Sequence, residues 1–417
     1  MRKGWLWFGV LLAAFLFAAC PVVEVQAEDL KADTELTRGE FAGMLAEKAG
    51  IKAEKILPAE LLKQKGIVKG YPGGELFLDR SITRAEAAAM VVRTLGLEDE
   101  VLFSLTSKEQ REWAYAFCSW LERYGLIEGD PFGVMTREEG SAFLDRIFTS
   151  DPEALSIMEK AKEKLKEIND MSSTINAKIK IVPQTEAEET GILYDIEVNM
   201  EINQEIVMPD KVHQKITVEA DVPGADKAKF ISEMYYIGDK VYAKIPNEES
   251  GEMQWYRYPE GIYPDLNKVI SDNSYSVPPE LEKYIRYRMM GKTTINGEEV
   301  YQLACYGSIK DFNEFIETVY PQLGMDQQLM KLWEDSVGLM ENISLWGFQN
   351  IGAVDFSDKG GELLFVITFT PEFKGEAVPI KRIQMNIKVE DLKYNQNLTI
   401  ELPEEAVNAQ VLSIERE

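Results

Sequence analysis

The chain has 417 residues, with 71 acidic and 45 basic side chains and a formal net charge of −26. A protein of this charge repels nucleic acid and anionic lipid headgroups, so we expect no nucleic-acid partner. Its single histidine, His213, excludes histidine-based catalytic triads and multi-histidine metal sites.

The sequence also lacks the motifs of nucleotide and calcium chemistry. It has no Walker-type loop, no Gly-x-Gly-x-x-Gly after a strand and no EF-hand loop. Its acidic pairs are too numerous to nominate a glycosidase dyad. We therefore expect no cofactor, no metal and no enzymatic activity.

Residues 1–27 have the pattern of a secretory signal peptide. Arg2 and Lys3 precede an apolar stretch over 5–19, and Ala27 ends a suitable small-residue cleavage site. Lipidation at Cys20 is the alternative, because the residues before it resemble a lipoprotein signal, and cleavage after Ala27 is favoured. No later segment is apolar enough to span a bilayer, so we expect an exported protein.

A four-residue motif, Thr-Arg-x-Glu, occurs three times in the next part of the chain. The copies are Thr37-Arg38-Gly39-Glu40, Thr83-Arg84-Ala85-Glu86 and Thr136-Arg137-Glu138-Glu139. Thr-x-x-Glu is a capping box, and apolar residues follow each copy at helical spacing. The recurrence predicts a supersecondary unit that is used three times, with helices starting near Thr37, Thr83 and Thr136.

The arginine of the motif needs a separate explanation, because a positive charge at the first helical position opposes the helix dipole. One interpretation is an anionic ligand held by the guanidinium and by free backbone N–H groups. The other is an ion pair with a nearby carboxylate. The sequence leaves both open.

The segments before the motifs carry a family resemblance over about residues 30–149. Gly66-Ile67-Val68-Lys69-Gly70-Tyr71-Pro72 precedes the second copy, and Gly125-Leu126-Ile127-Glu128-Gly129 precedes the third. This order of helix, glycine-rich loop and Thr-Arg-Ala-Glu helix resembles S-layer homology repeats. The resemblance implies an all-α helical repeat module that binds pyruvylated secondary cell-wall polysaccharide, and so a place at the cell wall or cell surface.

The same resemblance implies the binding residues. Arg84 with Tyr71 and Gly70 is the best-preserved set, and Arg38 and Arg137 are the equivalent arginines. The sequence departs from the family pattern in three places. Tyr71-Pro72-Gly73-Gly74 replaces the usual Tyr-Pro-Asp-Gly, Asp130-Pro131 replaces Tyr-Pro, and the first copy has almost no helix or loop before Thr37 once the signal peptide is removed. We therefore expect at least one of the equivalent sites to be lost.

Residues 150–417 have a different pattern, typical of an α+β domain with a curved antiparallel sheet covered by helices. A helix is expected over 151–170, and a tight hairpin turn at 237–240. Alternating apolar and polar residues predict strands at 194–203, 212–222, 383–389 and 398–402. Helical stretches are expected near 279–290, 310–320 and 327–341.

This second region resembles the LolA/LppX-like lipoprotein superfamily. The resemblance rests on the helix before the first strands, on 234–244 and on 398–406. It implies a half-barrel that cups helices or an acyl ligand, and it identifies no binding residue.

Two functions follow from the sequence as a whole. The first is a non-catalytic envelope protein, attached to the wall by its repeats, whose second domain holds a hydrophobic ligand or partner. The second is a purely structural surface-layer component with a sealed β-domain spacer. An apolar cavity in the second domain would favour the first.

Overall fold

The computed structural model describes residues 34–52, 56–71, 73–103, 113–184, 194–221, 227–247, 250–259, 284–309, 338–373 and 375–412. The signal peptide and the helices predicted over 310–320 and most of 327–341 lie outside these ranges. The chain forms two compact units. The repeat unit contains Val22–Ala154 with Arg286–Met290, and the sheet unit contains Leu155–Ile285 and Gly291–Glu417.

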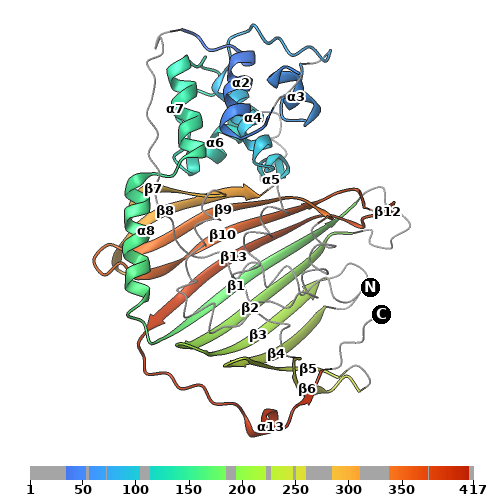
Figure 1. Ribbon diagram of the computed structural model, residues 1–417, viewed down its shortest axis with the longest axis vertical. Helices are drawn as coiled ribbons and strands as arrows, with labels where there is room; N and C mark the ends of the chain where they lie inside the picture. Colours follow the sequence, from blue (N-terminus) through green and yellow to red (C-terminus); the bar gives the residue numbers. More distant parts are fainter. Residues whose placement is uncertain are drawn as a thin grey trace. The chain divides into compact units, whose positions relative to one another are not determined.

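The helices of the repeat unit include the three predicted from the Thr-Arg-x-Glu motif (Figure 1). They are α2 (Arg38–Lys48), α3 (Pro58–Gln64), α4 (Arg84–Thr94), α5 (Glu98–Phe103), α6 (Trp113–Arg123) and α7 (Arg137–Phe148). Helices α2, α4 and α7 begin at Thr37, Thr83 and Thr136, each with a complete capping box. The predicted helix starts are therefore confirmed.

The prediction of an all-α module is wrong, because the residues that precede these helices are extended and pair with one another. Isolated β-bridges join Glu35 to Thr136, Thr37 to Ser81 and Thr83 to Val134. Three backbone hydrogen bonds close the arrangement into a ring: Leu36 N–H to Met135 O, Met135 N–H to Ile82 O and Ile82 N–H to Leu36 O. We call this the backbone ring.

The core of the repeat unit forms around the backbone ring. Leu36 and Ile82 are completely buried, and Met135 is nearly so. The aromatic rings of Phe41 and Phe143 stack with their centroids 6.3 Å apart. Gly140 lies where a Cβ atom would overlap the Leu36 side chain, so the first turn of α7 needs a glycine.

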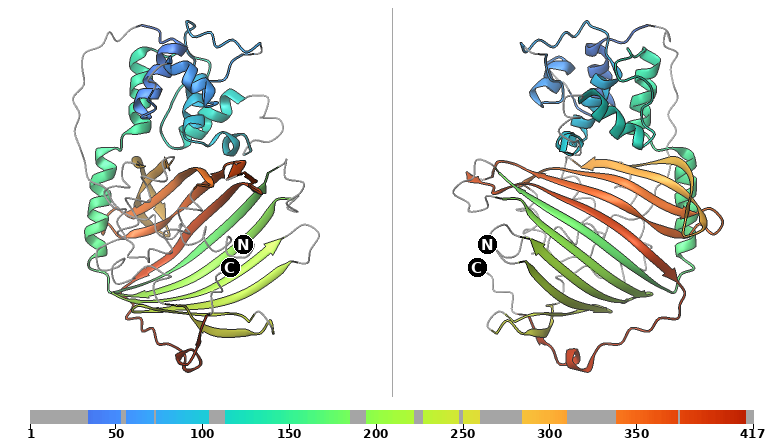
Figure 2. Two further views of the ribbon diagram at one scale, coloured as in Figure 1. Left: turned by 45° about the vertical axis from the view of Figure 1, so that its right-hand side comes forward. Right: turned by 180° about the vertical axis from the view of Figure 1, so that it is seen from behind.

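The sheet unit is built on a twelve-stranded, mostly antiparallel sheet (Figures 1 and 2). In spatial order its strands are β14 (Gln410–Val411), β6 (Met253–Arg257), β5 (Lys240–Pro246), β4 (Ala228–Ile237), β3 (Lys211–Asp221), β2 (Ile196–Val207), β1 (Asp170–Pro183), β13 (Ile380–Tyr394), β10 (Asp358–Phe369), β9 (Met340–Gly352), β8 (Glu298–Ile309) and β7 (Ile285–Ile295). Strands β11 (Glu372–Phe373) and β12 (Glu376–Ala377) form a separate pair. Helix α8 (Pro152–Leu165) precedes β1, and the short α13 (Glu404–Val407) precedes β14.

Several sequence predictions for this region hold. The register pairs Val198 with Ile179, and Ile179 with Met385, so their side chains share one apolar face. The turn between β4 and β5 is the predicted hairpin, with Gly238 at a φ of +64°. The helix expected over 151–170 is α8.

Two elements differ from the prediction. The helix expected near 279–290 is a strand from Ile285 onward, and residues 279–283 lie outside the described ranges. The strand expected at 398–402 is an unpaired extended segment, in which Ile400 packs on Tyr235, Tyr242 and Trp255 of the sheet. Its alternation therefore comes from burying one side against a sheet face.

Glycines allow a close approach between β9 and β10. A Cβ at Gly347 would overlap the Glu362 carbonyl oxygen, and one at Gly361 would overlap the Phe348 carbonyl oxygen. Neighbouring strands therefore approach here more closely than any residue with a side chain permits.

Two glycine substitutions in the repeat unit test its packing. Gly43→Ala in α2 should raise the free energy of unfolding by about 0.5–1 kcal/mol, because a Cβ there meets nothing within 4 Å and alanine is the better helix former. Gly140→Ala should instead lower it by about 1–3 kcal/mol, because the added methyl group collides with buried Leu36. Urea unfolding of both variants measures the difference. Equal effects would contradict the close packing of α7 on the backbone ring.

Candidate functional site

The three motif arginines pair with glutamates in a closed cycle. Arg38 Nη1 lies 2.7 Å from Glu86 Oε1. Arg84 Nη2 pairs with Glu139 Oε1, and Arg137 Nη2 pairs with Glu40 Oε1. Each arginine thus contacts the capping glutamate of a different copy, and the cycle returns to its start. Of the two interpretations left open by the sequence, the structure shows the ion pair.

Each glutamate of the cycle has two functions, one for each carboxylate oxygen. Glu139 Oε2 accepts the Thr136 N–H at 2.9 Å as part of the cap, while its Oε1 faces Arg84. In Glu40 the hydrogen bond from the Thr37 backbone, and after it the Thr37 hydroxyl and the Arg137 charge, hold the pKa below its usual value, against the opposing effect of burial. Helix capping and contact between copies are therefore made by the same side chain.

The first amides of these helices donate within the protein. The N–H groups of Arg84 and Ala85 donate to the carbonyl oxygens of Gly133 and Pro131, at 3.0 and 2.9 Å. The N–H of Glu86 donates to the Thr83 hydroxyl at 3.3 Å. An anion at this helix start would therefore meet only the guanidinium. The backbone N–H groups that the sequence analysis expected to be free already donate to Gly133, Pro131 and Thr83.

The first arginine cluster, defined by Arg38, Tyr71 and Arg80, is closed. Arg38 is 4% exposed, and it donates from Nε to Leu76 O at 3.0 Å and from Nη2 to Lys69 O at 3.3 Å. The Tyr71 ring lies 5.0 Å from the Arg38 guanidinium carbon and 5.1 Å from that of Arg80. The Tyr71 hydroxyl donates to Glu86. Burial, followed by this hydrogen bond and the Glu86 charge, raises the pKa of Tyr71.

The second arginine cluster surrounds Arg84 and is more open. The Arg84 side chain is 18% exposed. A Cβ at Gly129 would lie 3.3 Å from Arg84 Nε, and one at Gly133 would overlap Nη1, so two glycines make room for the guanidinium. Phe132 lies between these glycines in the chain and packs edge-to-face against Tyr115 of α6, with centroids 5.6 Å apart.

The third arginine, Arg137, is the most exposed of the three, at 30%. Its backbone N–H donates to Thr34 O at 3.0 Å. The residues before Thr34 lie outside the described part of the chain.

The structure groups the site residues differently from the prediction, which placed Gly70 and Tyr71 with Arg84. Gly70 and Tyr71 lie with Arg38, whereas Arg84 lies with Gly129 and Gly133. The reason is that Arg38 and Arg84 each extend toward the loop of the following copy. Gly70 has its own structural reason to be glycine, because a Cβ there would lie 2.8 Å from the Gly74 backbone.

Sequence reasoning missed Arg80, Phe132 and Tyr115, and it did not identify Glu139 as the partner of Arg84. The loop residues could have been found by aligning the copies, since Arg80 O and Gly133 O accept equivalent amide hydrogen bonds. Tyr115 gave no signal, because an aromatic residue at helical spacing is usually a core residue.

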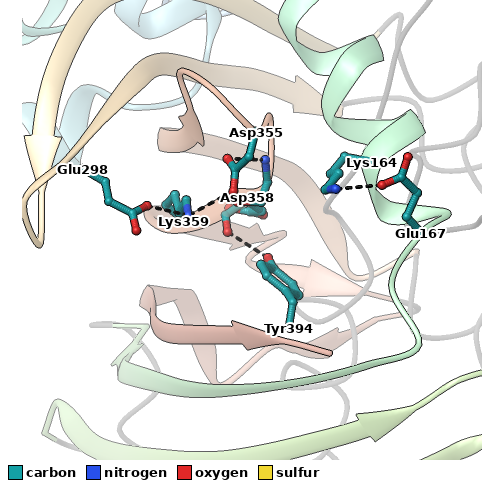
Figure 3. Close-up of polar contacts among 8 residues, drawn as sticks. Lys164, Glu167, Glu298, Asp355, Asp358, Lys359 and Tyr394 are labelled. Atoms are coloured by element: carbon teal, nitrogen blue, oxygen red, sulfur yellow. Dashed lines mark hydrogen bonds and ion pairs between the residues drawn. The ribbon is translucent and has the colours of Figure 1, made fainter. Parts of the chain in front are cut away.

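A second polar cluster lies in the sheet unit at the turn between β9 and β10 (Figure 3). Lys359 Nζ lies 2.6 Å from Glu298 Oε2 and 3.4 Å from Asp355 Oδ2, which links β8 to the turn. The Tyr394 hydroxyl donates to the Asp358 carbonyl oxygen at 2.8 Å. These contacts join three strands and the turn, so the cluster is a structural clasp.

His213 is held between two glutamates of the neighbouring strands. Its Nδ1 lies 3.2 Å from Glu205 Oε2 and its Nε2 lies 2.9 Å from Glu233 Oε1, and its ring stacks on Tyr235. Within the described ranges, no group of three or more His, Cys, Asp or Glu side chains could hold a metal ion. Cys118 and Cys305 are both buried, and neither forms a disulfide bond within the described part of the chain.

Comparisons with known proteins agree with part of this description. Residues 58–88 match the S-layer homology domain, a domain of cell-envelope attachment that binds cell-wall polysaccharide. The match spans α3, Gly70, Tyr71 and the second Thr-Arg-x-Glu motif. No curated protein matches the chain. Among the helices that the structure describes, none is both long and apolar enough to cross a membrane.

Solved structures of lipoproteins overlap the chain at low similarity. The lipoprotein LppX of Mycobacterium tuberculosis is 11% identical with a TM-score of 0.29, over 60% of this chain and 100% of its own. LprF of Mycobacterium bovis is 13% identical with a TM-score of 0.26, over 61% and 99%. A putative outer membrane lipoprotein-sorting domain from Vibrio parahaemolyticus is 11% identical with a TM-score of 0.21, over 59% of this chain and 94% of its own. At these TM-scores the likeness carries no functional argument.

The exposure of the ion pairs predicts how much each contributes to stability. Glu86→Gln should lower the free energy of unfolding by about 3–5 kcal/mol, because it leaves the buried Arg38 charge without its partner. Glu139→Gln, at the more exposed Arg84, should cost only about 0.2–1 kcal/mol. Thermal and urea unfolding of the full chain provide the measurement. Similar losses in the two variants would mean that the first cluster is not closed.

The titratable groups of the clasp predict how the free energy of unfolding changes with pH. Burial raises the pKa of Asp358 above its ordinary 3.8, despite hydrogen bonds from the Gly360 N–H and the Gln349 amide that lower it. The folded protein therefore keeps a proton that the unfolded chain releases, and the free energy of unfolding falls as pH rises above 3.8. Asp358→Asn should remove this fall, so its stability relative to the parent should increase with pH.

Asp355→Asn is the matched control, with the opposite sign. Although burial opposes it, the Ser357 and Lys359 contacts hold the pKa of Asp355 below its ordinary value. This carboxylate therefore stabilises the fold above the unfolded pKa, and the variant should lose stability relative to the parent as pH rises. Unfolding measured from pH 3 to 7 would contradict the assignment if both variants followed the same trend.

Proposed function

We propose that this protein is a non-catalytic, exported envelope protein anchored to pyruvylated secondary cell-wall polysaccharide through its motif arginines. The observation that carries the proposal is the graded exposure of three equivalent guanidinium groups, from 4% at Arg38 through 18% at Arg84 to 30% at Arg137. Arg84 is the chief ligand contact and Arg137 is the second. Arg38, Tyr71 and Gly70 belong to the first cluster, which supports the loop of the matched domain.

The chemistry suits a sugar that carries a carboxylate. Arginine holds a carboxylate through two parallel N–H bonds, which gives both affinity and orientation. The Arg84–Glu139 pair is partly solvated, so a ligand carboxylate that displaces Glu139 leaves neither charge in a dry interior. The same exchange at Arg38 would strand Glu86, which is 11% exposed, beside a buried arginine.

The second unit is proposed to hold a hydrophobic ligand or partner on the apolar face of its sheet. The alternation that places Val198, Ile179 and Met385 side by side continues over neighbouring strands and forms a buried apolar face, against which such a ligand would pack. The alternative is a purely structural component whose sheet is a sealed spacer. Saturable uptake of a long-chain fluorescent fatty acid, altered by Met200→Ala, would support the first, and no uptake would support the second.

Wall attachment is tested by sedimentation of the full chain with purified pyruvylated polymer. Arg84→Ala should pellet far less than the parent, because it removes the chief charged contact, and the parent's binding should weaken as salt rises. Lys48→Ala is the matched control, since Lys48 is an exposed cation of the same unit that pairs with Asp145, outside the arginine cycle. If Arg84→Ala pellets as well as Lys48→Ala, Arg84 is not the contact. If the parent pellets equally with polymer stripped of pyruvate, the carboxylate is not recognised.

A further inference from the structure

The second arginine cluster differs from the first at equivalent positions. The Arg38 N–H donates to Arg80 O in one, and the Arg84 N–H donates to Gly133 O in the other, so Gly133 stands where Arg80 stands. By the same alignment, Phe132 replaces Asp79. The guanidinium of Arg80, which lies over Tyr71 in the first cluster, therefore has no counterpart beside Arg84. The second cluster instead has the exposed ring of Phe132 at the position of Asp79.

The aromatic pair of this cluster is among the exposed large apolar side chains of the repeat unit. Phe132 is 56% exposed and Tyr115 is 46% exposed, although their rings pack on each other at an interplanar angle of 78°. A single exposed aromatic residue needs no explanation. Two that contact each other, beside a partly exposed arginine, form a surface with both an apolar and a charged part.

The position of Phe132 is fixed by the helix that carries Arg84. The carbonyl oxygens of Pro131 and Gly133, on either side of Phe132, accept the first two amides of α4. The Phe132 N–H itself donates to Asp130 Oδ1 at 3.1 Å. The Phe132 backbone is therefore anchored at the start of the helix that carries Arg84, and the contact with Tyr115 positions the ring.

We infer that Phe132 and Tyr115 form a stacking subsite for a neutral sugar ring next to the acidic sugar held by Arg84. This inference rests on the proposed function. The C–H face of a pyranose is apolar and packs on an aromatic face, while the Tyr115 hydroxyl offers a hydrogen bond to a sugar hydroxyl. The ligand class is thus a polysaccharide in which a carboxylate-bearing sugar adjoins a neutral hexose. Charge is read by the arginine and ring shape by the aromatic pair.

The test is a titration of the full chain with soluble fragments of the pyruvylated polymer at several salt concentrations. The double variant Phe132→Ala/Tyr115→Ala should bind about tenfold more weakly, with an unchanged salt dependence, because only apolar contact is lost. Arg84→Ala should lose both affinity and salt dependence. Phe77→Ala, which removes a 43% exposed ring of the first cluster, is the control and should bind as the parent does.

The outcomes separate the two claims. If the double variant binds as the parent does while Arg84→Ala is impaired, the stacking subsite is wrong and the proposed wall attachment stands. If neither change affects binding, or the parent does not bind, both are wrong. If Phe77→Ala weakens binding as much as the double variant does, the effect is not specific to the second cluster and the inference is overturned. Unchanged thermal unfolding of the variants confirms that folding is not the cause.

Discussion

The backbone ring between the segments that precede α2, α4 and α7 is the constraint on which the repeat unit depends. Each of its residues, Leu36, Ile82 and Met135, both donates to one neighbour and accepts from the other. Because the capping threonine that follows is itself extended, the ring and the capping boxes impose the same backbone conformation on one short stretch. The arginine–glutamate cycle then adds side-chain contacts between the same copies. Local capping is therefore coupled to the closure of three copies, and an isolated copy would leave both sets of contacts unmade.

Sequence similarity and ligand access point to different places in this unit. The match to the S-layer homology domain over residues 58–88 includes Gly70 and Tyr71, which lie against the most buried of the three arginines. Gly70 is needed for close backbone approach, and Tyr71 fills the space between two guanidinium groups. The matched residues of this loop therefore fit a role in building the frame. The residues that replace Arg80 and Asp79 in the next copy, Gly133 and Phe132, lie where the guanidinium is accessible.

Features that depend on residues close together in the sequence could be predicted, and those that depend on contacts between distant segments could not. The capping boxes, the hairpin at Gly238 and the shared face of Val198 and Met385 depend on residues close together or on a strict period of two, and all were found. Which glutamate each arginine meets depends on how three distant segments close, and no local pattern encodes that. The helix expected near 279–290 failed because β7 begins at Ile285. The extended stretch around Ile400 alternates like a strand because it buries one side on the sheet, and periodicity cannot distinguish the two.

The two oxygens of each capping glutamate explain how one motif can serve both structure and binding. In Glu139, Oε2 completes the cap of α7 and Oε1 meets Arg84, so under the proposed function a ligand carboxylate would replace Oε1 while the cap remains. In Glu86, Oε1 is held at once by Arg38 and by the Tyr71 hydroxyl, and both contacts would be lost together. Because Arg38 is only 4% exposed, losing these contacts would leave a buried charge without a partner and strongly lower the free energy of unfolding. The Thr-Arg-x-Glu motif therefore forms a fixed contact where it is buried, and the proposed anion site is the copy in which the arginine is open to solvent.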